Sequence, residues 1–311
     1  MSARVTVSLE DLLRLKADAR GFSFLPRQPI SSLLAGRHAS RLRGRGLAFE
    51  ELRQYQQGDD VRTIDWRATA RLRSPHIRVY SEERERPVLV VVDQRRPMFF
   101  GSRRTMKSVT AAEVAALAAW KTLQVGDRVG GIVFNEREIC DLRPHRSQTR
   151  VLRLFHEIVR LNQELAESAE EPPAGGDVNL DTALDAARRR ATHDHLVVVI
   201  SDLDRAGEET QHLATELAAH NDVLVVATYD PLGATLQSRP GMMAATADGQ
   251  IELPPDRNFD SAFQEAFSTH LDSWRQIFRS LRVPVLPIST AEPPADQLRA
   301  LFGEPHSTSQ A

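Results

Sequence analysis

Two stretches decide the fold of this chain: Val88-Leu-Val-Val-Val-Asp93 and His195-Leu-Val-Val-Val-Ile-Ser-Asp202. Such short β-branched runs are typical of strands that are buried on both faces of a parallel sheet. Each run ends in a carboxylate. Because ligands bind outside the carboxyl ends of parallel strands, these two Asp residues indicate an ion site at one edge of a sheet.

Strands and helices alternate from residue 88 onward, which predicts an α/β fold with a doubly wound, mostly parallel sheet of Rossmann type. A hairpin adds one antiparallel strand at 138–142. The other expected strands are 88–93, 128–134, 195–201, 223–228 and 283–288, and the expected helices are 107–124, 149–163, 180–191, 207–219 and 259–280.

The first 87 residues form a different region, a smaller α+β head that precedes the α/β domain at 88–302 and a disordered tail at 303–311. In the head we expect helices at 9–19 and 49–55, and a hairpin of strands 63–71 and 77–84. Residues 1–87 carry 17 Lys and Arg against 11 Asp and Glu, while residues 88–311 carry 23 against 31. A basic head indicates an acidic partner, nucleic acid or the acidic body of the same chain as its binding surface.

The composition is that of a protein that works in the cytoplasm. Its one cysteine, Cys140, allows no internal disulfide and fits a reducing compartment. No apolar run approaches the ~20 residues of a membrane helix, so we expect no membrane insertion.

Oxygen-bearing side chains gather where the two decisive strands end. Asp93, Ser201, Asp202 and Asp204 fall on one rim of the sheet, and the loop that ends at Thr182 can reach it. Such ligands favour hard cations such as Mg²⁺ or Ca²⁺.

This arrangement resembles the von Willebrand factor A domain, whose metal site uses an Asp-x-Ser-x-Ser loop, a later Thr and an Asp after the fourth strand. Asp93 matches the first Asp, Asp202 the last, and Thr182 loosely matches the Thr. Arg95 and Pro97 stand where the two Ser belong, so the resemblance implies a degenerate metal-ion-dependent adhesion site.

A divalent cation at this site would lose two ligands and meet a positive charge. We therefore predict no resident cofactor, and we expect Arg95 or Arg96 to lie against Asp93 and Asp202 as a built-in cation. Binding of Mg²⁺ through Asp93 and Asp202 is the alternative.

A longer motif lies in the head: Gly44 to Arg53, Tyr55, Gly58-Asp-Asp-Val-Arg-Thr-Ile-Asp-Trp66 and Ala70-Arg71. It resembles the hallmark of a bacterial family, domain-of-unknown-function family fifty-eight, and the likeness extends from about residue 36 to 290. Members pair such a head with a von Willebrand factor A-like body and are commonly encoded beside a MoxR-type AAA+ ATPase. The resemblance implies an adaptor or effector of that ATPase in protein maturation or remodelling, with other von Willebrand factor A-type proteins as further partners.

The charges of this motif have two interpretations. Carboxylates and guanidiniums alternate beside Trp66, which predicts ion pairs that lock the head onto the body, while Gly58 permits a tight turn. The alternative is a docking surface for the ATPase. The residues concerned are Arg53, Tyr55, Gly58, Asp59, Asp60, Arg62, Asp65, Trp66, Arg67 and Arg71.

No phosphate-binding Gly-x-x-x-x-Gly-Lys-Ser/Thr loop, nucleophile elbow or His-Glu-x-x-His motif occurs in the sequence, so no catalytic residue is assigned. Three hypotheses follow. The first is a non-enzymatic interaction protein that works with the ATPase. The second is a metal-dependent hydrolase that uses Asp93, Asp202 and Asp204. The third is a nucleic-acid binder through residues 37–73, which the scarcity of aromatic side chains for base stacking disfavours.

Overall fold

The structure is a computed structural model, and it describes residues 4–20, 47–57, 59–82, 86–168, 176–246, 249–280 and 283–302. The chain divides into two compact units, which are described separately. One contains residues 1–31 and 86–311 and is called the α/β unit, and the other contains residues 32–85 and is called the small unit. The predicted tail at 303–311 lies outside the described residues.

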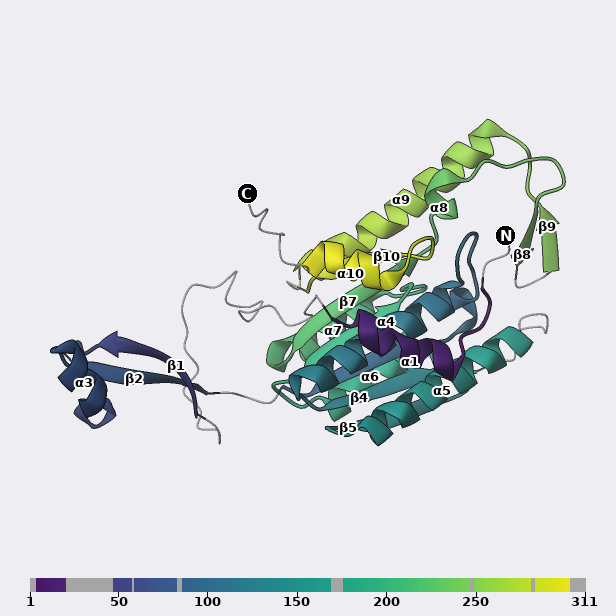
Figure 1. Cartoon of the computed structure of the whole chain (residues 1–311). Coiled ribbons are helices and arrows are strands. Elements are labelled where there is room, and N and C mark those ends of the chain that lie inside the picture. Colours follow the sequence, from purple (N-terminus) through teal and green to yellow (C-terminus); the bar gives the residue numbers. More distant parts are fainter. Residues whose placement is uncertain are drawn as a thin grey trace, which may run out of the picture. The chain divides into compact units, whose positions relative to one another are not determined.

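A six-stranded sheet with the order β10-β7-β6-β3-β4-β5 forms the centre of the α/β unit (Figure 1). All neighbours are parallel except β4 and β5, as the sequence predicts. Every residue of β3, β4 and β6 is buried, because helices cover both faces of the sheet. The strands are β3 (Val88–Asp93), β4 (Val129–Phe134), β5 (Ile139–His145), β6 (Leu196–Ser201), β7 (Asp222–Tyr229) and β10 (Val285–Ser289).

Helix α4 (Lys107–Val125) is the central helix of one face. It packs against α1 (Leu9–Asp18), α5 (Gln148–Glu167) and α10 (Pro294–Phe302), and it is therefore buried on nearly every side. Trp120 of α4 meets Phe155 of α5 edge to face at 5.4 Å between ring centroids, and its indole N–H donates to the carbonyl of Leu12 at 2.9 Å. Gly126 ends the helix with φ at +87°, a conformation that suits glycine.

The opposite face is covered by α6 (Leu180–Arg190) and α7 (Glu208–His220), which pack against each other over a second apolar cluster. Between β7 and β10 the chain adds a short helix α8 (Leu232–Thr235), a hairpin of β8 (Met243–Thr246) and β9 (Gly249–Glu252), and the long helix α9 (Arg257–Ser280). The sequence predicted α9, but it did not predict α8, α10 or this hairpin.

The small unit consists of β1 (Leu47–Gln54), the 3-10 turn η1 (Val61–Thr63), α3 (Trp66–Leu72) and β2 (His76–Glu82). Strands β1 and β2 pair antiparallel, with a bulge between Phe49 and Glu51. Ile77 of β2 is buried, and so is Ala68 of α3. This unit therefore has a minimal core of its own.

Two predictions for the head are wrong. Residues 49–55 form most of a strand rather than a helix, and residues 63–71 form a turn and a helix rather than a strand. Residues 49–55 are extended because β1 pairs with β2. Capping explains the second difference: Asp60 accepts from the amide of Arg62, and Asp65 accepts from the amides of Arg67 and Ala68. These bonds start helical turns inside a stretch whose residue pattern looks extended.

The predicted domain boundary also differs from the structure at the N-terminal end. Helix α1 belongs to the α/β unit, because Leu12 is fully buried in the cluster around α4 and Val7 donates its amide to Asn162 of α5 at 2.8 Å. Ser8 caps α1 in a capping box with Asp11. Only residues 32–85 remain for the small unit.

We predict that Leu12→Ala lowers the free energy of unfolding of the α/β unit by about 2–5 kcal/mol, because it leaves a cavity between α1 and α4. Leu13→Ala is the matched control, since Leu13 is 36% exposed, and it should cost no more than about 0.5 kcal/mol. Urea unfolding followed by tryptophan emission, to which the buried Trp120 contributes, measures both. Equal losses for the two variants would show that α1 is not part of this core.

Candidate functional site

The candidate site lies where β3 and β6 end side by side. From β3 the chain continues to β4 on one side, and it later returns to β6 on the other side, so the gap between β3 and β6 is the topological switch point of the sheet. Asp93 ends β3 and Ser201 ends β6. The Ser201 hydroxyl donates to Asp93 Oδ2 at 2.6 Å, and both residues are fully buried. The predicted meeting of these two residues at one rim is confirmed.

The side chain of Arg95 folds back onto Asp93 and binds both oxygens of its carboxylate. Its Nε lies 3.0 Å from Oδ1 and its Nη2 lies 2.7 Å from Oδ2, and its backbone amide donates to Oδ1 at 3.0 Å. The guanidinium carbon lies 5.5 Å from the centre of the Phe134 ring, and Arg95 is only 5% exposed. The prediction that an arginine lies against Asp93 is confirmed for Arg95.

Nearby carboxylates stabilise the positive charge of the Arg95 guanidinium. Burial on its own would lower the pKa of Arg95, but the neighbouring carboxylate of Asp93, with further contributions from Asp202 and Asp204, raises it above its ordinary value. Arg95 is therefore a cation at neutral pH, as arginine side chains in proteins generally are. The two oxygens of Asp93 accept four hydrogen bonds, from the Ser201 hydroxyl and from Arg95.

Asp202 has a different cation, which sequence reasoning did not identify. Lys107 at the start of α4 places its Nζ 2.5 Å from Asp202 Oδ2, and Asp202 Oδ1 accepts from the amide of Asp204 at 3.0 Å. Both side chains are largely buried. The prediction that one arginine serves both Asp93 and Asp202 is therefore corrected. A right-handed crossover brings the first turn of α4 back over the strand ends, and Lys107 is the cation that it carries.

Arg96 and Pro97 begin the short turn η2 (Arg96–Met98). The backbone amide of Arg96 donates to Glu136 Oε1 at 2.6 Å, and the backbone carbonyl of Glu136 accepts from Val178 at 3.3 Å. Glu136, a second residue that sequence reasoning missed, thus joins the loop after β3 to the segment that leads into α6. Pro97 has a structural explanation, because the fixed φ of proline suits the first turn of a helix.

Thr182 is held away from Asp93 by its own helix. Its hydroxyl donates to the carbonyl of Asn179 at 2.8 Å and accepts from the Asn179 amide at 2.9 Å, in the capping box of α6. Among the described residues, Thr182 makes no hydrogen bond with Asp93 or Asp202. Asp204 is the outermost member of the rim, with a side chain that is 41% exposed and 3.7 Å from Arg205.

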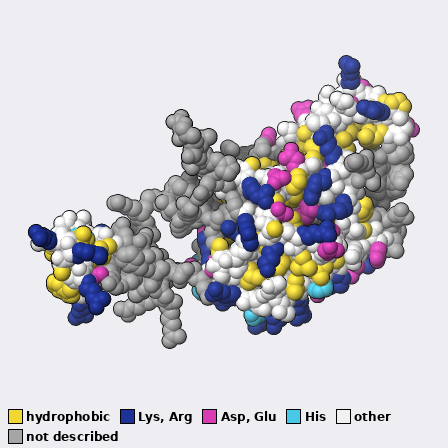
Figure 2. Space-filling view, in the orientation of Figure 1, with side chains coloured by type: hydrophobic (Ala, Val, Ile, Leu, Met, Phe, Trp, Pro, Cys, Tyr) yellow, Lys and Arg dark blue, Asp and Glu magenta, His cyan; other side chains and the backbone are white. Residues whose placement is uncertain are grey.

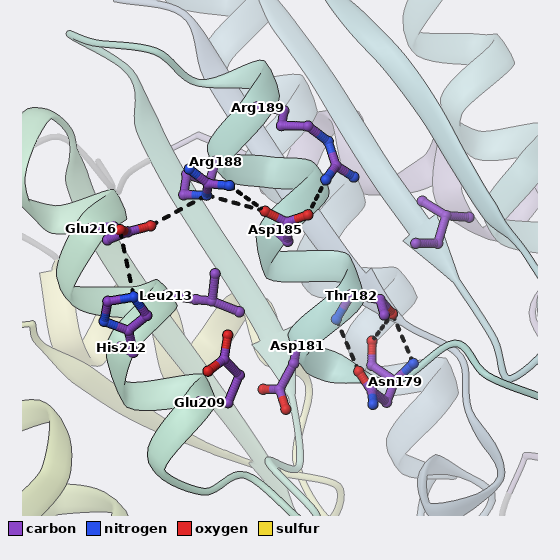
Figure 3. Close-up of a pocket in the computed structure, with 11 residues that line it drawn as sticks. Asn179, Asp181, Thr182, Asp185, Arg188, Arg189, Glu209, His212, Leu213 and Glu216 are labelled. Atoms are coloured by element: carbon purple, nitrogen blue, oxygen red, sulfur yellow. Dashed lines mark hydrogen bonds and ion pairs between the residues drawn. The ribbon is translucent and has the colours of Figure 1, made fainter.

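Thr182 instead lines an open pocket of about 620 Å³ between α6 and α7 (Figure 3). Two carboxylates of this pocket are engaged: Asp185 pairs with Arg188 and Arg189, and Asp181 accepts from the Thr210 hydroxyl at 2.5 Å. Across the part of the chain that the structure describes, no group of three or more His, Cys, Asp or Glu side chains is placed to hold a metal ion.

The hallmark of the small unit divides into internal and exposed residues. Arg53 and Asp59 form a bidentate pair at 2.8 and 2.9 Å, and the hydrogen bond from Arg53 is the main reason that the pKa of Asp59 is lowered. Both residues belong to the small unit, so this pair does not test the prediction of ion pairs that lock the head onto the body. Tyr55 is half-buried and donates its amide to the Pro75 carbonyl at 2.8 Å. The exposed members are Arg62, Trp66, Arg67 and Arg71, the helix caps are Asp60 and Asp65, and Gly58 lies outside the described residues.

Residues 51–272 match the family model described as protein of unknown function DUF58. The chain belongs to this family. Three relatives, one uncharacterized protein from Mycobacterium bovis and two from strains of Mycobacterium tuberculosis, are each 26% identical over 279 residues. That alignment covers 89% of this chain and 85% of each relative. The DUF58 match begins inside β1 and ends inside α9, so it spans both units.

None of the helices within the described ranges combines the length and the apolar character that crossing a bilayer requires.

We predict that Arg95→Met lowers the free energy of unfolding by about 3–5 kcal/mol, because it leaves the Asp93 carboxylate buried without a counter-charge. Adding Asp93→Asn to the same chain should restore much of this loss, since the neutral side chain can accept from the backbone amide of position 95 with its Oδ1 and donate from its Nδ2 to the Ser201 hydroxyl. Urea unfolding measures both variants. Arg103→Met is the control, because Arg103 is exposed, and an Arg95→Met variant as stable as this control would contradict the pairing.

Proposed function

We propose that this DUF58 protein is a cytoplasmic, non-enzymatic interaction module whose body is a von Willebrand factor A-like domain with a degenerate adhesion site. In this proposal it acts as an adaptor or effector of a MoxR-type AAA+ ATPase in protein maturation or remodelling. The ATPase partnership rests on the resemblance of the family hallmark. The sheet order and the single antiparallel edge strand support the von Willebrand factor A likeness.

One observation carries the proposal: protein cations occupy both carboxylates that a metal would need. Arg95 pairs with Asp93 through two parallel hydrogen bonds, and Lys107 pairs with Asp202. A divalent ion would have to displace both cations and would find Arg95 and Pro97 where hydroxyl ligands are required. Recognition at this rim is therefore proposed to be independent of metal.

The hydrolase alternative is weaker for the same reason. It needs Asp93 and Asp202 as free ligands of a nucleophile-generating ion, but both carboxylates accept hydrogen bonds from cations. Asp204, at the edge of the rim, is a single carboxylate and does not provide enough ligands to hold such an ion.

The metal-binding part of the proposal is tested by calorimetric titration of the wild-type chain with Mg²⁺ and with Mn²⁺. We expect no saturable binding. The double variant Arg95→Ser/Lys107→Ala removes both cations. Saturable metal binding gained only in this variant would support the view that Arg95 and Lys107 prevent a metal from binding to Asp93 and Asp202. Saturable binding to the wild type that Asp93→Ala abolishes would contradict the proposal.

The partner is tested by mixing the purified chain with a purified MoxR-type ATPase encoded beside it, in the absence and presence of ATP. We expect a complex in at least one nucleotide state, detected by light scattering after size-exclusion chromatography. The double variant Asp93→Asn/Arg95→Met removes the charges of this one pair and leaves the Lys107–Asp202 pair in place. It should still bind the ATPase if no metal is involved. Absence of a complex in either nucleotide state would count against the adaptor role.

A further inference from the structure

Helix α3 has an outward face that no described residue of the small unit covers. Ala68 is the buried residue of this helix, whereas Trp66, Arg67, Ala70 and Arg71 are exposed. Their i,i+4 spacing places Trp66 with Ala70 and Arg67 with Arg71 on adjoining lines of the helix surface. We call these four residues the α3 face.

Trp66 is the notable member of the α3 face. It is 71% exposed, the highest value among the large apolar side chains of the described residues. Its indole makes no ring or cation contact with any described residue. Val61, five residues before Trp66, and Leu72, six residues after it, are also exposed, at 60% and 48%. A tryptophan left in water in this way is typical of a binding anchor rather than of a core.

The arginines of this region have no carboxylate partner within the described ranges. Among the described residues, Arg62, Arg67, Arg71 and Arg73 form no ion pair. The nearby carboxylates are used elsewhere: Asp59 holds Arg53, while Asp60 and Asp65 accept from backbone amides at the starts of helical turns. Figure 2 shows hydrophobic and basic side chains next to each other on the surface of the small unit.

We propose that the α3 face is the docking surface of the small unit, and that its occupant is a protein surface with an apolar pocket rimmed by Asp or Glu. The indole of Trp66 fills the pocket, and Arg67 and Arg71 pair with the rim. Arg is suited to this role because its guanidinium binds carboxylates through two hydrogen bonds. The hallmark thus separates into an internal scaffold around Arg53 and Asp59 and an external contact surface on α3.

Charge complementarity favours a protein over a nucleic acid. Residues 32–85 contain eleven arginines and no lysine against eight Asp and Glu, so the small unit carries only a modest excess of positive charge. A nucleic-acid footprint is strongly basic, and a single-strand platform offers several aromatic rings for successive bases. The α3 face has one ring, and its exposed neighbours Val61 and Leu72 cannot stack on bases.

The test replaces Trp66 in the full chain with the photo-reactive residue p-benzoylphenylalanine and irradiates cells that express it. The same replacement at Leu301 is the control, because Leu301 is an exposed apolar residue of the α/β unit. We expect a cross-link at position 66, absent at 301, to one protein, with mass spectrometry placing the attachment in an apolar segment flanked by Asp or Glu.

Affinity of the purified pair gives the second readout. Trp66→Ala should weaken binding to the cross-linked protein at least about tenfold, and Arg67→Glu/Arg71→Glu should weaken it with an effect that shrinks as salt rises. Leu301→Ala and Arg153→Glu, both at exposed positions of the α/β unit, should leave the affinity unchanged. Unaltered urea midpoints for all variants would exclude misfolding as the cause.

The inference rests on the proposed function only for the expectation that the cross-linked protein is the ATPase, so the two can fail separately. A cross-link to another protein with this acidic, apolar surface supports the α3 face and overturns the ATPase partnership. A cross-link to nucleic acid or to a second copy of this chain overturns the inference. The inference is also overturned if position 66 cross-links no better than position 301, or if the Trp66→Ala variant binds as tightly as the wild type.

Discussion

The buried ion pair between Asp93 and Arg95 is the interaction on which the rim of this protein depends. Asp93 has no exposed surface, and a carboxylate in such a position must be paired and hydrogen-bonded. Arg95, only two residues further along the chain, donates to both oxygens from its side chain and to one of them from its backbone amide. The turn η2 with Pro97 comes directly after Arg95, and Ser201 of the neighbouring strand completes the site.

The same rim is held together by groups from every part of the α/β unit. Gln94, next to Asp93, donates to the carbonyl of Ser108 on α4 and accepts from Asn162 on α5, which in turn accepts from the amide of Val7. At the end of β7, Asp230 accepts from Ser102 and Thr290. Burial would raise the pKa of Asp230, but these hydrogen bonds outweigh it and lower the pKa. The carboxylates of Asp93, Asp202 and Asp230 at the strand ends are therefore all hydrogen-bonded within the α/β unit.

Much of this could be predicted from the sequence, because burial on both faces of a sheet leaves continuous apolar runs such as 88–93 and 196–201. The Asp93–Arg95 pair was also accessible, since it joins residues two positions apart. Lys107 and Glu136 were not, because they reach the rim only through the crossovers of the folded chain. In the small unit, the caps Asp60 and Asp65 were misjudged, since a capping carboxylate and an ion-pairing carboxylate look alike in a sequence.

The division of the hallmark has a consequence for how the protein is expected to work. In the α/β unit, Arg95 and Lys107 pair with the two rim carboxylates, whereas in the small unit the indole of Trp66 and the guanidiniums of α3 are exposed. Recognition in this account depends on side chains that are present at all times rather than on an exchangeable ion. Its affinity for a partner should therefore respond to ionic strength and not to the supply of divalent cations.

The most direct test is a crystal structure of the wild-type chain grown with Mn²⁺, with anomalous scattering used to locate the metal. The account predicts density for the Arg95 guanidinium on Asp93 and for the Lys107 ammonium on Asp202, with no anomalous peak at the rim. An anomalous peak between Asp93 and Asp202, with Arg95 turned away, would contradict it.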